Sequence, residues 1–299
     1  MGDVVFESGY EAEAWREIRE WELRPEARLA QALRRLTTPV GFVTDRLLVR
    51  PVLGRGADRL GERMRAAASS LGGRVDVDGV LQRTSGEVGR PVASLEDLRG
   101  VDLRTLDRMV AGADRKYIAA ASASGGTAGA ASTIPGGSLV ALGVLGADVV
   151  ASTVLLLRAI AAYGTQYGRD MTTPAEAQFA VGLLSLGAVA GDPKARETLL
   201  GEVHEVSALM ATGASWETLQ RTPSVQALQA VFDRLGTRLT KRKLAQVVPF
   251  FGAAAGGTLG AALADNTCRT AYMQYRRRYL IDKYPELRAP EPRGGLFRR

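Results

Sequence analysis

The 299-residue chain contains one cysteine, Cys268, and one histidine, His204. A single cysteine excludes an internal disulfide framework and indicates a reducing compartment. One histidine and one cysteine cannot build a zinc site, so we expect no metal and no cofactor. Catalysis by a Cys–His or Ser–His–Asp arrangement would depend on His204, and no G-x-S-x-G segment presents a serine.

Other familiar signals are missing as well. The N-terminus lacks a basic segment followed by an apolar one, so we expect no signal peptide and a cytoplasmic protein. The mean hydropathy of −0.04 argues against a protein with many membrane spans. No glycine motif of a phosphate-binding loop is present. No segment alternates between apolar and polar residues as a strand does, which predicts an all-α fold.

The charge balance is basic, with a formal net charge of +7. A basic protein favours acidic partners, either anionic lipid or nucleic acid. No recognised nucleic-acid-binding motif is present, so no nucleic-acid partner is expected. Most of the basic residues are arginine, and a GC-rich coding bias would explain that preference equally well.

One long apolar stretch runs from Ile134 to Leu157, and Asp148 is its only charged residue. From Ser138 onward it predicts a helix that is apolar almost all round, which fits the centre of a core or a membrane span. A carboxylate there is costly unless it is paired or protonated. Arg158 is too distant along the helix to be its partner. We therefore expect Asp148 to be buried beside a polar group or to line a cavity.

A second uncharged stretch covers residues 247–264 and is closed by Asp265 and Asn266. If Asp148 and Asp265 face each other, they could share a proton or bind a hard cation, which makes them the candidate catalytic residues. Alternatively, each carboxylate is satisfied by Arg, Asn or Ser from a neighbouring helix. Small residues such as Gly125, Gly129 and Gly260 predict close helix packing in both stretches.

The remaining pattern predicts a single large helical domain built around these two Gly/Ala-rich stretches. Residues 1–93 form an N-terminal helical extension that begins with a helix at 10–23 and contains a loop near 72–93. Residues 94–285 form the helical core, which opens with a Ser94–Asp97 capping pair. Residues 286–299 are expected to be a disordered basic tail.

Two basic clusters flank the second apolar stretch. The residues expected to meet a membrane surface are Lys241, Arg242, Lys243, Arg276, Arg277 and Arg278. Tyrosines lie among the last three, and such a mixture suits a membrane interface. A solvated amphipathic face is the alternative interpretation. We expect peripheral binding to acidic lipid through these clusters.

Four segments carry a resemblance to a known family. They are the early Trp15/Trp21 helix, the Gly-rich run at 125–132, the segment GADVVASTVLLLRAIAAYGTQYGRD at 146–170, and VVPFFGAAAGGTLGAALADNT at 247–267. Together they resemble the EcsC family, and the segment at 146–170 is similar to its pattern of an Asp-containing helix that ends in Arg and is followed by Tyr-Gly and Asp. The resulting candidates for ligand-binding or buried polar residues are Asp148, Arg158, Tyr163, Asp170, Asp265 and Asn266.

The resemblance implies a loose link to an ABC transporter and, more weakly, to hydrolases. Two hypotheses follow. The first is a membrane- or lipid-associated accessory protein, peripheral to the inner face of the cell membrane, with a membrane protein as a further partner. The second is a soluble hydrolase-like enzyme that uses Asp148 and Asp265 as buried carboxylates.

Overall fold

The computed structural model describes the backbone of residues 4–23, 75–131, 137–189, 192–232 and 252–288. Side chains are described over the same ranges except at 124–131, 137–149 and 252–259. Within these ranges every regular element is helical, so the all-α prediction is confirmed. The predicted tail begins too early, because η2 (Pro285–Arg288) is a 3-10 turn, and residues 289–299 lie outside the described part.

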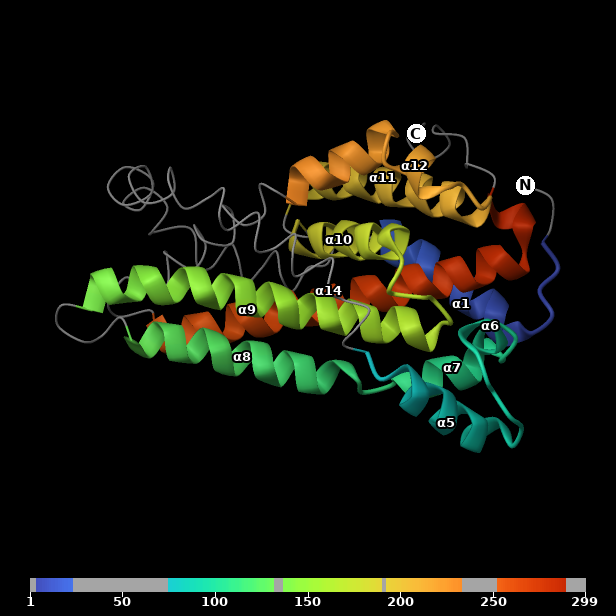
Figure 1. Ribbon diagram of the computed structural model, residues 1–299, viewed down its shortest axis with the longest axis horizontal. Coiled ribbons are helices and arrows are strands. Elements are labelled where there is room, and N and C mark those ends of the chain that lie inside the picture. Colours follow the sequence, from blue (N-terminus) through green and yellow to red (C-terminus); the bar gives the residue numbers. More distant parts are fainter. Residues whose placement is uncertain (1–3, 24–74, 132–136, 190–191, 233–251, 289–299) are drawn as a thin grey trace, which may run out of the picture.

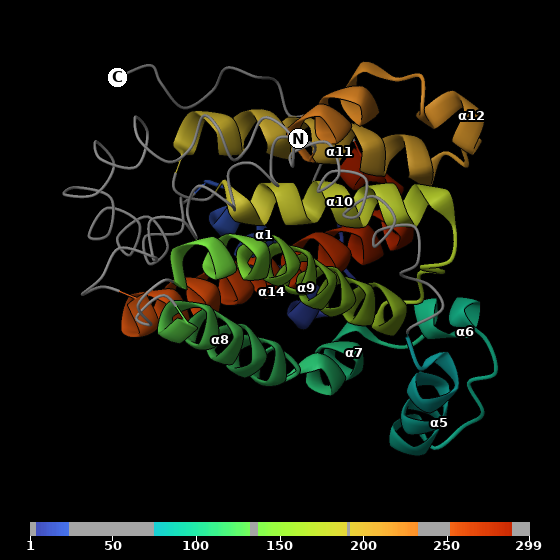
Figure 2. The same ribbon diagram turned by 60° about the vertical axis from the view of Figure 1, so that its left-hand side comes forward.

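Helix α14 (Gly252–Lys283) is the axis of the fold. It contacts α8 (Asp114–Ala131), α9 (Gly137–Gln166), α10 (Pro174–Ala188) and α1 (Gly9–Leu23), which lie around it in both views (Figures 1 and 2). Its contact with α8 is the most extensive in the molecule. Helix α11 (Pro193–Ala211) and the short α12 (Trp216–Leu219) pack on the far side of α10. A helix enclosed in this way must bury polar as well as apolar side chains.

The prediction of a loop at 72–93 is wrong. Helix α5 (Val77–Val88) begins at Asp76, whose side chain accepts a hydrogen bond from the Gly79 N–H, and it ends at Gly89 in the left-handed conformation. Val80 and Thr84 are buried four residues apart, a helical spacing that the Gly- and Asp-rich composition concealed. The α6 helix (Leu95–Arg99) opens with the expected Ser94–Asp97 capping box, and α7 (Leu103–Val110) follows it.

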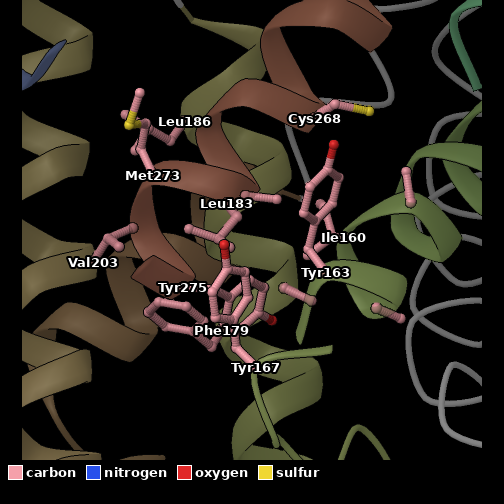
Figure 3. Packing of buried hydrophobic residues seen from close by; sticks show 14 of the residues in the cluster. Ile160, Tyr163, Tyr167, Phe179, Leu183, Leu186, Val203, Cys268, Met273 and Tyr275 are labelled. Carbon is pink, nitrogen blue, oxygen red and sulfur yellow. The ribbon is translucent and has the colours of Figure 1, made fainter. Parts of the chain in front are cut away.

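Asp265 and Asn266 were expected to end the second apolar stretch, but α14 continues through both. The buried Asn266 side chain donates a hydrogen bond to the carbonyl oxygen of Gly187 at the end of α10. The amide therefore ties two helices together and does not cap its own. Further along the same two helices, Tyr275 packs edge-on against Phe179, with ring centroids 5.7 Å apart (Figure 3).

Gly168, two residues before the end of the segment 146–170, has a φ of +74°, a conformation that favours glycine. A Cβ atom at this position would collide with the carbonyl oxygen of Leu95 in α6. Arg99 also donates from Nε to the Gly168 carbonyl oxygen at 2.9 Å. The Tyr-Gly pair is thus the point at which the end of α9 meets α6.

Close packing between α14 and α8 is testable at Gly260. A Cβ atom there would lie 2.5 Å from the carbonyl oxygen of Ala121. Gly260→Ala is therefore expected to cost about 1–3 kcal/mol of unfolding free energy, measured by urea denaturation. Gly86→Ala in α5 is the matched control, since nothing lies within 4 Å of its added methyl. It should stabilise by about 0.5–1 kcal/mol. Equal stability of the two variants would contradict close packing at Gly260.

Candidate functional site

Three consecutive arginines of α14 reach three different helices. Successive residues of an α-helix point about 100° apart, so Arg276, Arg277 and Arg278 cannot share one face. Arg276 lies 2.8 Å from Glu17 of α1 and 2.9 Å from Asp107 of α7. The other two arginines face α1 and α10.

The expectation that these arginines meet a membrane surface is wrong. Arg276 and Arg278 are only 2 % and 5 % exposed, and the side chain of Arg277 is 12 % exposed. All three are held in ion pairs inside the helical bundle. The tyrosine–arginine mixture that suggested a lipid interface is the interior of the protein.

Asp107 is the centre of the first buried cluster. Its two carboxylate oxygens accept hydrogen bonds from the hydroxyls of Tyr10 and Tyr167, and Arg276 lies beside them. Burial raises the pKa of Asp107, although the Arg276 charge and the tyrosine hydroxyls oppose that rise. The cluster joins α1, α7, α9 and α14 through one carboxylate.

Glu22 is the centre of a second cluster, at the end of α1. Its carboxylate lies 2.8 Å from Arg19, 2.9 Å from His204 of α11 and 3.3 Å from Arg277. Burial opposes its ionisation, but the His204 contact and the charges of Arg277 and Arg19 outweigh burial and lower the Glu22 pKa. Burial lowers the pKa of His204, which favours its neutral form.

Glu176 and Arg278 form the third cluster, between α10 and α14. Two bonds of 2.6 and 2.7 Å join them in a bidentate pair, and the guanidinium lies 4.4 Å from the Phe179 ring centroid. Neighbouring Arg169 is bonded to Asp282 at 2.6 Å. The three clusters make this half of the molecule a rigid, charge-paired base.

The sequence pattern did not lead us to the acidic partners of the three arginines, although the position of these carboxylates on their helices was informative. Glu22 lies four residues after Ile18, and Asp107 four residues after Leu103, so each falls on the apolar stripe of its helix. A carboxylate on a buried stripe implies a buried cation elsewhere in the fold. That cation is supplied by α14 in both cases.

The residues selected from the family pattern are scattered. Arg158 and Asp170 are exposed, and Asp170 accepts a hydrogen bond from the Thr172 N–H in the turn before α10. Tyr163 is buried, with its hydroxyl directed toward Cys268 (Figure 3). Asp265 is half-buried. The candidates whose side chains are described do not form one site, and the side chain of Asp148 lies outside the described part of the chain.

Two further expectations are not tested. The side chain of Asp148 lies outside the described residues, so the pairing of Asp148 with Asp265 stays a prediction, as does the enzyme built on it. Lys241, Arg242 and Lys243 also lie outside them. Among the described residues, no cluster of three or more His, Cys, Asp or Glu side chains could hold a metal ion.

Among the described residues, three helical segments are nearly free of charge. Helices α8, α9 and the first part of α14 extend together beyond α10 and α11 (Figure 1). We call residues 117–131, 137–157 and 252–264 the apolar arm. Asp148 is the only charged residue in these three segments. Within the described part of the chain, no helix is both long and apolar enough to cross a membrane.

A layer of polar side chains separates the apolar arm from the base. Burial raises the pKa of the Tyr117 hydroxyl, with Cys268 adding to the rise and Arg158 opposing it. Burial also raises the pKa of Cys268 to about 12, helped by Asp114 and Asp265. These side chains come from α8, α9 and α14, so they mark one level across all three helices.

The model of the EcsC protein family matches residues 12–280 of the chain. That span runs from α1 almost to the end of α14 and includes both the base and the apolar arm. In the comparisons with curated proteins and with solved structures, nothing matches the chain.

Proposed function

The chain belongs to the EcsC protein family, and we propose that it is a membrane- or lipid-associated accessory protein at the cytoplasmic face of a cell membrane. The observation that carries this proposal is the separation of charge along one bundle. Buried ion pairs hold one end together, while the segments of the apolar arm contain a single charged residue, Asp148. Helical segments with so little charge are suited to an apolar phase.

The length of the apolar arm favours partial insertion. Its segments in α8 and α14 rise about 20 Å, and its longer segment in α9 rises about 30 Å, at about 1.5 Å per residue. The hydrocarbon core of a bilayer is about 30 Å thick, so one leaflet is about 15 Å. Two of the three segments can therefore pass through one leaflet but are too short to cross both, or the arm can enclose an acyl chain. A membrane protein such as an ABC transporter would then meet the protein in the plane of the membrane.

The test places charge on the outer face of the apolar arm. Ala120 and Ala151 are exposed on α8 and α9, so Asp at both positions should leave the fold intact. Aspartate costs up to about 3 kcal/mol at the hydrocarbon centre. We expect the Ala120→Asp/Ala151→Asp protein to partition at least tenfold more weakly into phosphatidylcholine/phosphatidylglycerol vesicles in a flotation assay.

Ala12→Asp/Ala111→Asp is the matched control, because these alanines are exposed on α1 and at the end of α7. The control should float with the vesicles as the unaltered protein does. A protein that binds no vesicle of any composition, or an arm variant that binds as well as its control, would overturn the proposed function.

A further inference from the structure

A set of exposed basic side chains surrounds the root of the apolar arm. Arg115 and Lys116 lie on α8, Arg158 on α9 and Arg269 on α14, and all four are exposed. We call these four residues the basic collar. They come from all three helices of the arm. Apart from Asp148 and Asp265, no charged residue lies between these four positions and the far end of the arm segments.

The collar residues lie close together along the bundle. A Cβ atom at Gly260 of α14 would lie 2.5 Å from the carbonyl oxygen of Ala121 of α8, which aligns the two helices near Lys116 and Arg269. The Tyr163 hydroxyl of α9 is directed toward Cys268, the residue before Arg269 (Figure 3). The four residues therefore come from three adjacent helices and lie within about two helical turns of one another.

Two acidic residues, Asp114 and Asp265, lie near the collar and are half-buried, whereas the four collar residues are exposed. Because the four cations exceed the two carboxylates, this part of the bundle carries net positive charge. Above the collar, the exposed side chains of the described residues are small and uncharged: Ala119, Ala120, Ala123 and Ala151.

We infer that the basic collar binds the phosphate groups of an anionic phospholipid leaflet and sets the depth to which the apolar arm enters it. This inference rests on the proposed function and names its partner. Phosphate groups lie at the edge of the hydrocarbon, where arginine and lysine can extend their charged ends while their stems stay apolar. A sharp step from exposed cations to uncharged surface is the arrangement such a boundary requires.

The inference predicts a preference for anionic lipid. Each basic residue near such a surface strengthens binding by roughly fivefold, and salt screens this gain. We expect the protein to bind phosphatidylglycerol-containing vesicles at least tenfold better than pure phosphatidylcholine vesicles at low salt. The variant Arg115→Gln/Lys116→Gln/Arg158→Gln/Arg269→Gln should lose this preference, with binding reduced to the level seen on phosphatidylcholine.

Two matched variants complete the experiment. Arg83→Gln/Arg90→Gln/Lys194→Gln/Arg221→Gln removes the same number of exposed charges of the same types elsewhere, and it should keep the preference. Arg115→Lys/Arg158→Lys/Arg269→Lys keeps the collar's charge and should also retain it. Thermal unfolding followed by circular dichroism checks that each variant is folded.

The outcomes separate the two proposals. A collar variant that still prefers anionic vesicles, or a distant variant that loses the preference equally, overturns the collar. If the collar variant still prefers anionic vesicles while the Ala120→Asp/Ala151→Asp protein binds vesicles more weakly, the proposed function stands and only the collar is rejected. Absence of binding to either vesicle type overturns both.

Discussion

Glu176→Gln is expected to lower the free energy of unfolding by about 3–5 kcal/mol, because it leaves Arg278 as an unpaired buried cation. Arg278 is 5 % exposed, and two hydrogen bonds join its guanidinium to the Glu176 carboxylate. Glutamine keeps the shape of the side chain but removes its charge and replaces one of its two acceptor oxygens by an NH2 donor. The loss should therefore report the ion pair and not a cavity.

The neighbouring cation adds to this effect. Burial and the nearby charge of Arg278 lower the pKa of Arg169 to about 10, although Asp282 and Glu176 oppose the change. Without Glu176, two buried guanidiniums share the carboxylate of Asp282, whose side chain is 33 % exposed. Loss of the Glu176 charge therefore leaves both Arg278 and Arg169 with less compensation for their buried positive charges.

A double variant identifies the cause. In Glu176→Leu/Arg278→Met both charges are removed, and a buried pair replaced in this way is often neutral or stabilising. Glu7→Gln is the control, since Glu7 is 70 % exposed beside Lys283 and should cost at most about 1 kcal/mol. Urea denaturation gives all three values. A double variant as unstable as Glu176→Gln would show that packing, and not charge, holds α10 to α14.

Much of the helical framework could be predicted from local pattern. The Ser94–Asp97 capping box and the apolar stretches within α9 and α14 are properties of neighbouring residues. The close contact of Gly260 with α8 was also predicted by the spacing of small residues. These features depend on contacts within a helix or on side-chain size alone.

The charged base could not be predicted in the same way. A helix with polar residues on several sides is usually exposed to water, so Arg276, Arg277 and Arg278 were expected at the surface. Whether they are buried depends on carboxylates such as Glu22 and Asp107, which are separated from them by more than 150 residues. Helical periodicity fixes the angle between side chains of one helix but not which helix lies opposite.

Glu22→Gln is expected to destabilise the protein by about 3 kcal/mol at neutral pH. The Glu22 side chain is 4 % exposed, and Arg277, at 12 %, lies 3.3 Å from it. Removing one partner of a buried pair leaves the other charge uncompensated. Glu13→Gln on the same helix is the control, because Glu13 and its partner Arg16 are 71 % and 68 % exposed and 3.7 Å apart. Its cost should not exceed about 1 kcal/mol.

Acid should close the gap between Glu22→Gln and the unaltered protein. The folded-state pKa of Glu22 lies below its ordinary value of 4.5, so its contribution is complete above pH 4.5 and is lost as the pH falls through the folded value. The effect of His204 begins at a higher pH. Its folded-state pKa is lowered from 6.5, so the unfolded chain binds the proton more readily than the folded protein, and stability declines as the pH falls below 6.5. Denaturation curves of Glu22→Gln, His204→Gln and Glu13→Gln between neutral and acid pH would separate the two steps. A Glu22→Gln deficit that stays constant down to the lowest pH at which the protein folds would mean that the shape of Glu22, and not its charge, joins α1 to α14.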